Sequence, residues 1–194
     1  RMLGQINVYG TSTMGILLSK DPAWVRAHGN DMAQIILSGR WGGMNEILST
    51  NGSNFPDRLK LVFRNFPSNG VFRQRHPIEP GMNIDWPSFH PVTGENAWAV
   101  MNLLHTAQAQ KNAGIDNSLN LKAAKMIMDE GLLKMQADNG GIRFAPRGTS
   151  AGEESQGGRS YDTHVISPEW SAGALDALLE MSEYLKTSDP QRSK

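Results

Sequence analysis

Two stretches of this sequence place a carboxylate and an indole together where an apolar helical pattern begins. In "TGENAWAVMNLLHTAQAQ" these are Glu95 and Trp98, and in "SPEWSAGALDALLEMSEYLK" they are Glu169 and Trp170. Hydrolysis of a glycosidic bond requires one carboxyl group to protonate the leaving oxygen and another to activate water or attack the sugar. An indole adds a flat apolar face on which a sugar ring can stack. The two stretches therefore suggest carbohydrate chemistry.

A third acid lies in the proline-bounded loop "NIDWPSFHP", where Asp85 precedes Trp86. We take Glu95 and Asp85 as the first candidates for acid and base, with Glu169 in reserve. A carboxyl group beside an apolar ring has its pKa raised by desolvation, as a general acid needs. The side chains expected to bind substrate are aromatic rings or hydrogen-bonding groups in the same regions: Trp86, Trp98, Trp170, Asn96, His90 and Tyr161.

Each of these residues also has a purely structural explanation. Glu169 follows a capping serine by two positions, where the helix dipole alone favours an acid, and Glu95 has the same explanation. Trp98 and Trp170 could instead lie in the core. Asp85 could form an Asx-turn in a proline-containing loop. The pattern by itself leaves both explanations open.

Composition argues against several other classes of function. Lys and Arg together number 19, as do Asp and Glu, and no basic stripe is present, so we expect no nucleic-acid partner. No run approaches the roughly 18 apolar residues of a membrane span. The absence of cysteine excludes disulfides and thiolate sites. The five histidines form no HExxH-like pair, and no phosphate-binding loop or GxSxG elbow occurs. We therefore expect no metal and no cofactor.

The elements that must position these residues are helices. Helical spacing and capping signals predict five of them, at about 5–20, 22–39, 94–112, 118–139 and 168–186. Asp21 and Ser167 are expected caps before prolines, Ser118 is a further candidate cap, and Gly140 is expected to end the fourth helix. Two long loops, 40–93 and 145–165, separate the helices, and the second is expected to be partly mobile.

The order of elements predicts an all-α array of helical hairpins. Short turns join the first helix to the second and the third to the fourth, whereas the long loops fall on the opposite side. An array with long loops on one face builds a binding face there. We expect residues 1–194 to form one such domain, with 40–93 as a loop insertion.

The phrase "TGENAWAVMNLLHTAQAQ", the helix "LKAAKMIMDEGLLKMQADNGGIRF" and the final helix resemble successive hairpins of the (α/α) toroid, or six-hairpin, glycosidases. The resemblance covers about 91–187 and is weak over 5–39. It implies that inner helices begin at a central cavity, and that the protein is a glycoside hydrolase acting on a poly- or oligosaccharide. It also implies an inverting mechanism, for which carboxyl groups lie about 6.5–9.5 Å apart.

Three alternatives accompany this resemblance. A polysaccharide lyase on the same scaffold would use Tyr161, His90 or His164 as its base. A non-catalytic interaction module would use the loop aromatics to pack a partner, leaving Glu95 and Glu169 as caps. A full toroid is about twice this length, so we expect either an open ring or the remainder of a larger toroid chain as partner. The sequence starts at Arg1 without a signal peptide, which leaves the compartment open.

Overall fold

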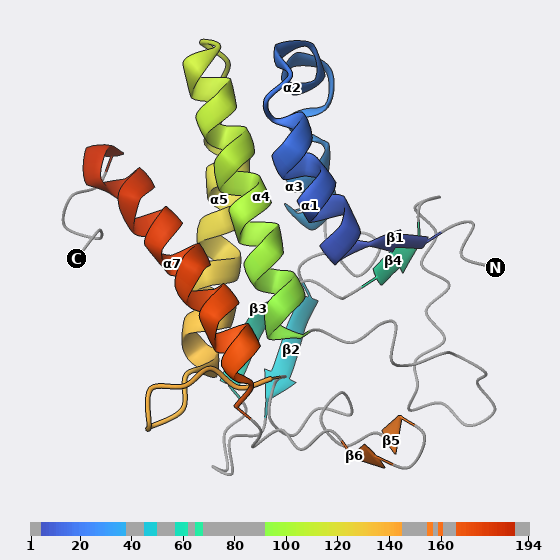
Figure 1. Ribbon diagram of the computed structural model, residues 1–194, viewed down its shortest axis with the longest axis vertical. Coiled ribbons are helices and arrows are strands. Elements are labelled where there is room, and N and C mark those ends of the chain that lie inside the picture. Colours follow the sequence, from blue (N-terminus) through green and yellow to red (C-terminus); the bar gives the residue numbers. More distant parts are fainter. Residues whose placement is uncertain are drawn as a thin grey trace.

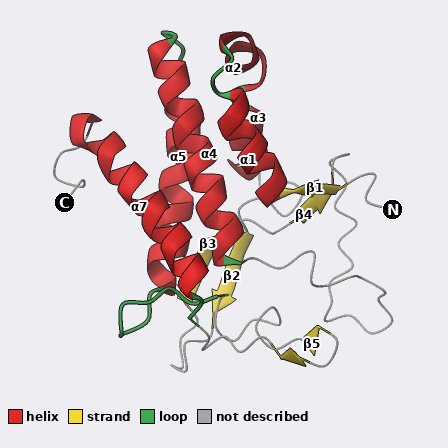
Figure 2. Ribbon diagram, viewed as in Figure 1, coloured by secondary structure: helices red, strands yellow, loops and turns green. Residues whose placement is uncertain are grey.

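The computed structural model describes residues 5–37, 45–49, 57–61, 65–67, 92–144, 155–156, 159–160 and 166–188. This part of the chain is mostly helical, as predicted for an all-α protein (Figure 2). The loop segment 145–165 was expected to be mobile, and most of it lies outside the described residues. The described strands are short and pair two at a time.

Three helices lie side by side and run in the same direction. They are α1 (Val8–Leu18), α4 (Thr93–Asn112) and α7 (Pro168–Ser188), and α4 lies in the middle and packs against both others. In Figure 1 each of the three begins at its own lower end, α4 and α7 near β2 and β3 and α1 higher in the view, beside β1. Their N-terminal turns therefore point toward the same end of the fold.

The other helices return behind this layer. After α1 the chain forms α2 (Pro22–His28) and α3 (Asp31–Leu37), and after α4 it forms α5 (Ser118–Ile127). A π-helical turn (Met128–Leu132) and a 3-10 turn (Leu133–Met135) extend α5 downward. α5 packs against α4 and α3, so the described helices form two layers (Figure 1).

One apolar cluster joins the two layers. It contains fully buried residues of α3, α4 and α5, such as Ile36, Leu103 and Ile127, and it continues into α7 through Ala174 and Met181. Alanines are frequent in this cluster, and their small side chains let the helices approach one another closely. Burial of this shared surface supplies most of the driving force that holds the layers together.

The strands form three antiparallel pairs within the described residues. β1 (Gln5–Asn7) pairs with β4 (Asn65–Pro67), β2 (Asn45–Ser49) with β3 (Asp57–Leu61), and β5 (Ser155–Gln156) with β6 (Arg159–Ser160). The first predicted helix therefore begins three residues late, because residues 5–7 pair with a strand from the loop insertion. β2, β3 and β4 lie within 40–93, the segment predicted as a loop insertion.

The predicted helix at 22–39 is wrong in one respect, because it is broken at Gly29 and Asn30. At this break, Gly29 and Asn30 take part in a buried network of hydrogen bonds with side-chain amides. The Asn120 side chain donates to the Gly29 carbonyl and to Oε1 of Gln110, both at 2.8 Å, and Gln110 donates to Oδ1 of Asn30 at 2.9 Å. In a continuous helix the Gly29 carbonyl would accept a hydrogen bond from a backbone amide. Here it accepts from the Asn120 side chain, so tertiary hydrogen bonds override the local helical pattern.

Helix ends agree with the sequence at some positions and differ at others. Asp21 caps α2 by accepting a hydrogen bond from the Ala23 amide at 2.8 Å, as predicted. Ser118 is not the cap of α5, because it is the first helical residue and donates to Asp116 instead. The helical run ends at Met135 rather than at Gly140, which occupies a turn with φ of 88°.

Candidate functional site

A cavity of about 290 Å³ opens where α1, α4 and α7 begin. We call it the N-terminal cavity, and define it by the residues that line it: Tyr9, Gly94, Glu95, Trp98, Glu169, Trp170 and Gly173. All of these residues lie in the first two turns of their helices. The cavity is formed by residues near the starts of three helices that run in the same direction.

The α7 wall of the cavity is built on Trp170. Ser167 accepts a hydrogen bond from the Trp170 amide at 3.4 Å, which confirms the predicted serine cap. The indole stacks on the Phe144 ring, with centroids 3.8 Å apart and planes 16° from parallel. On its other side lies Gly94, where a Cβ atom would stand only 3.3 Å from the indole. Close packing on both sides thus fixes the ring.

The α4 wall carries Glu95 and Trp98. Glu95 is buried, with 6% of its surface exposed, whereas Trp98 is half-buried. The Trp98 indole meets the Tyr9 ring edge-on, with centroids 5.4 Å apart and an angle of 81° between planes. Tyr9 is 48% exposed, so this aromatic pair forms an edge of the cavity that solvent reaches.

The start of α4 is held by the segment that follows α5. The Thr93 hydroxyl donates to the Arg143 carbonyl, and the Thr93 amide donates to the Phe144 carbonyl at 3.0 Å. Thr93 is therefore the first helical residue rather than a side-chain cap. The same segment supplies the ring that stacks on Trp170, so one short stretch supports both walls of the cavity.

Asn96 is placed behind the cavity. Its side chain is fully buried and donates to the Val92 carbonyl at 2.9 Å, one turn back in the chain. It is not among the residues that line the N-terminal cavity. This hydrogen bond stabilises the start of α4. The predicted contact of Asn96 with sugar hydroxyls stays a prediction.

The two acids of the cavity have different surroundings. Glu95 is enclosed, whereas Glu169 lies on the exposed side of α7. A pair of carboxyl groups in unlike environments can divide the tasks of acid and base. The cavity volume is close to the lower end of the about 300–1,000 Å³ typical of ligand pockets, so it suits a single ring rather than a long chain.

Several predicted site residues lie outside the described part of the chain: Asp85, Trp86, His90, Tyr161 and His164. The structure therefore brings together two of the three candidate acids, Glu95 and Glu169, and two of the three candidate tryptophans, Trp98 and Trp170. The catalytic and binding roles of all these residues stay predictions.

Tyr9 is a cavity residue that the sequence reasoning missed. A signal for it was present, because Tyr9 stands nine positions before Leu18, as Glu95 stands nine positions before Leu104. Alignment of the three helix starts on the leucine pairs Leu17-Leu18, Leu103-Leu104 and Leu178-Leu179 predicts from the sequence that Glu95 and Glu169 share one rim. Extending that alignment to ring-bearing residues would have placed Tyr9 at the same level as Glu95.

Other kinds of site are not found in this part of the chain. No group of three or more His, Asp or Glu side chains is placed to hold a metal ion among the described residues. Across the same residues, each helix is too short or too polar to cross a bilayer. No family model, curated protein or solved structure matches this chain.

Proposed function

We propose that this chain is a carbohydrate-active domain whose N-terminal cavity binds and hydrolyses a glycoside. One observation carries the proposal: Glu95, Glu169, Trp98 and Trp170 come from two distant stretches of sequence and line one cavity. Two carboxyl groups and the Trp98 indole at one opening are groups that a glycosidase needs for chemistry and for stacking, while Trp170, which is packed between Phe144 and Gly94, shapes the wall.

The surroundings of the two acids support separate roles. In this proposal Glu95, which is buried, is the general acid that protonates the leaving oxygen. Glu169, which is open to water, is the base that activates the attacking water molecule. This assignment replaces Asp85 by Glu169 in the first candidate pair, because Asp85 lies outside the described residues.

The arrangement of helices also supports the proposed relation to toroid glycosidases. A toroid repeats an inner helix and an outer helix around a ring, with the inner helices parallel and their N-termini at the active-site end. Here α1, α4 and α7 would be inner helices, and α3 and α5 outer ones (Figure 1). On this proposal the chain supplies two and a half of six hairpins.

The decisive experiment compares acid variants on a panel of neutral, amino and uronate oligosaccharides. We expect the unmodified chain to release new reducing ends from at least one member of the panel. Glu95→Gln and Glu169→Gln should each lower turnover by about a hundredfold to ten-thousandfold. Both should still bind the same sugar, as measured by tryptophan fluorescence. Proton NMR of the first product anomer tests the inversion that the resemblance implies.

Asp176→Asn is the matched control, since it removes a carboxylate of α7 outside the residues that line the cavity. It should keep full turnover. Turnover that is unchanged in Glu95→Gln would overturn the proposed acid. Binding of sugar without any turnover by the unmodified chain would show a non-catalytic binding domain, and no binding of any sugar would overturn the carbohydrate proposal itself.

A further inference from the structure

A second pocket, of about 520 Å³, lies on the side of α4 that faces α1. Its walls come from α1, α2, α3 and α4, and we call it the α1–α4 pocket. It shares no lining residue with the N-terminal cavity, and its volume falls within the about 300–1,000 Å³ typical of ligand pockets. The α1–α4 pocket is therefore a separate candidate for binding a small molecule.

The break between α2 and α3 shapes one wall of this pocket. Gly29 lies in the wall, and a Cβ atom there would stand 2.5 Å from the Val25 carbonyl oxygen and 3.0 Å from Nε2 of Gln110. The buried amides of Asn120 and Gln110 hold the turn in place through the hydrogen bonds described above. The wall is thus fixed before any ligand binds, which lowers the free-energy cost of binding.

The floor of the pocket is polar and belongs to α4. Asn102 and Thr106 line it, and only 3% of each residue is exposed. The Thr106 hydroxyl donates to Oδ1 of Asn102 at 3.4 Å, whereas Nδ2 of Asn102 has no acceptor within the described part of the chain. A Cβ atom on Gly15 would fall 2.8 Å from this nitrogen, so glycine at this position leaves room for the amide in the floor.

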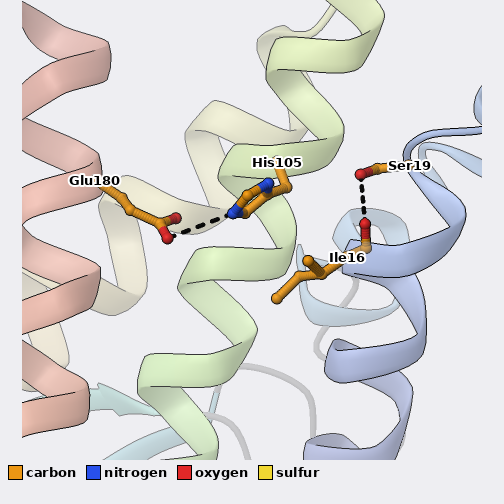
Figure 3. A network of polar contacts seen from close by, with 4 residues as sticks. All are labelled: Ile16, Ser19, His105 and Glu180. Carbon is orange, nitrogen blue, oxygen red and sulfur yellow. Dashed lines mark hydrogen bonds and ion pairs between the residues drawn. The ribbon is translucent and has the colours of Figure 1, made fainter.

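Other polar side chains of α4 have partners on neighbouring elements. His105, one position before Thr106, points toward α7 and lies 3.4 Å from Oε1 of Glu180 (Figure 3). Gln110 donates to Asn30 at the break between α2 and α3. Asn102 differs from them, because its side-chain nitrogen lies at the pocket without such a partner. A buried donor without an acceptor is costly, and an acceptor on a ligand would remove this cost.

The side chains above this floor are mainly apolar. Trp24 offers a flat face, and the full apolar set is Met14, Leu18, Trp24, Met32 and Ile35. The ionisable groups among the lining residues are His28 and Asp31, which lie 3.1 Å from each other, with more than half of each side chain exposed. Charge is thus confined to the rim. The buried part of a ligand must be uncharged, because an unpaired charge is costly to bury.

We infer that the α1–α4 pocket binds a compact, uncharged and mainly apolar molecule of one or two rings, which carries a carbonyl oxygen directed at Nδ2 of Asn102. The apolar walls match the body of such a molecule, and the Asn102 amide fixes its orientation. Because the two hollows share no lining residue, this binding is independent of the proposed glycoside chemistry.

The test compares benzophenone with diphenylmethane, which differ only in the group between their two rings, a carbonyl or a methylene. Equilibrium dialysis measures both affinities. We expect the unmodified chain to bind benzophenone about three- to tenfold more tightly, because only the ketone accepts a hydrogen bond. Asn102→Leu, which keeps the approximate shape of the side chain, should remove this preference. If circular dichroism shows that Asn102→Leu is unfolded, the preference of the unmodified chain and the wall variant below test the same proposal.

Met14→Ala is the wall variant. It should weaken the binding of both molecules by about three- to tenfold, through lost apolar contact. Met14 is more than half exposed, so the fold should tolerate the change. Leu17→Ala is the matched control, because Leu17 is an exposed apolar residue of α1 outside the pocket, and it should keep both affinities. Irradiation of bound benzophenone should link it to residues that line the pocket, as identified by mass spectrometry.

Four results would overturn the proposal. They are the absence of binding by either molecule, equal affinity of the unmodified chain for both, binding that Met14→Ala leaves unchanged, and labelling confined to residues outside the pocket. Sedimentation provides a further check. A dimer of the unmodified chain that Met14→Ala dissociates and benzophenone does not would make the pocket an interface between copies, and would also overturn the proposal.

Discussion

Gly15 and Gly173 are both interior glycines of parallel helices, yet they face α4 at very different distances. A Cβ atom on Gly15 would fall 2.2 Å from Oδ1 and 2.7 Å from Cγ of the buried Asn102 side chain. A Cβ atom on Gly173 would meet only the Ala97 Cβ at 3.9 Å, an ordinary contact. Gly15 is therefore required for the approach of α1 to α4, although its effect on helix propensity alone is unfavourable.

The same substitution should consequently have opposite effects at the two positions. Gly15→Ala should lower the free energy of unfolding by about 1–2 kcal/mol, because overpacking against Asn102 exceeds the gain in helix propensity. Gly173→Ala should leave it unchanged or raise it by up to about 1 kcal/mol. Urea unfolding measures both. A Gly15→Ala variant as stable as the unmodified chain would show that the two helices do not pack as described.

At the scale of elements, α4 and α7 are joined by a polar pair besides their apolar contact. The hydrogen bond from His105 to Glu180 raises the pKa of the histidine, and the nearby negative charge of Glu180 adds to this, against the opposing effect of partial burial. The folded state therefore favours protonated His105. The stabilisation is fully present below the ordinary histidine pKa of about 6.5 and is lost as the pH rises through the raised value.

Glu180→Gln should accordingly destabilise the protein more at about pH 5.5 than at about pH 9. The difference should stay below about 1 kcal/mol, because 45% of the His105 side chain and 36% of the Glu180 side chain are exposed and salt screens the pair. Glu183→Gln is the control, since its partner is Lys186 and lysine keeps its charge over this range. If Glu180→Gln lowers the free energy of unfolding equally at both pH values, the His105–Glu180 pair does not stabilise the protein.

Elements could be predicted from the sequence where the signal is local. Ser167 and Pro168 mark the start of α7 correctly, and the apolar spacing of α4 identifies buried residues such as Val100 and Leu103. The break at Gly29 does have a local signal, because Gly29 can end one helix and Asn30 and Asp31 can begin the next, but the hydrogen bonds made there to residues some 80–90 positions away have none.

The apolar face of α7 is also predicted only in part from the sequence. Helical periodicity in the sequence predicts that Leu175 and Leu179 lie on one apolar face with Met181, but both leucines are more than half exposed. They lie on the edge of the helix that no described element covers. For the candidate site, spacing from paired leucines predicted that Glu95 and Glu169 share one rim. The spacing could not show that Tyr9 lines the same cavity, since the position of Tyr9 depends on how α1 packs against α4.

At the scale of the whole molecule, one apolar cluster connects α3, α4, α5 and α7. Leu103 is fully buried within it, whereas Leu179 is exposed. Because the helices share their buried surface, loss of packing at one place should weaken all of them together, as expected for cooperative unfolding.

Leu103→Ala should therefore lower the free energy of unfolding by about 2–5 kcal/mol, through lost burial and the cavity left behind. Leu179→Ala should change it by less than about 0.5 kcal/mol. Circular dichroism, which follows the helices, and tryptophan fluorescence should report one midpoint for each variant. Two separate midpoints would mean that the layers unfold independently.

The walls of the N-terminal cavity come from residue 9, residues 94–98 and residues 169–173. A ribosome adds about 5–20 residues per second, so the last wall follows the first by roughly ten to thirty seconds. During that interval α1, α4 and α5 can already pack, while the side of α4 that bears Trp98 has no partner from α7. A nascent chain halted before residue 168 would thus hold most of the helical core and no ligand cavity, with an open indole available to chaperones.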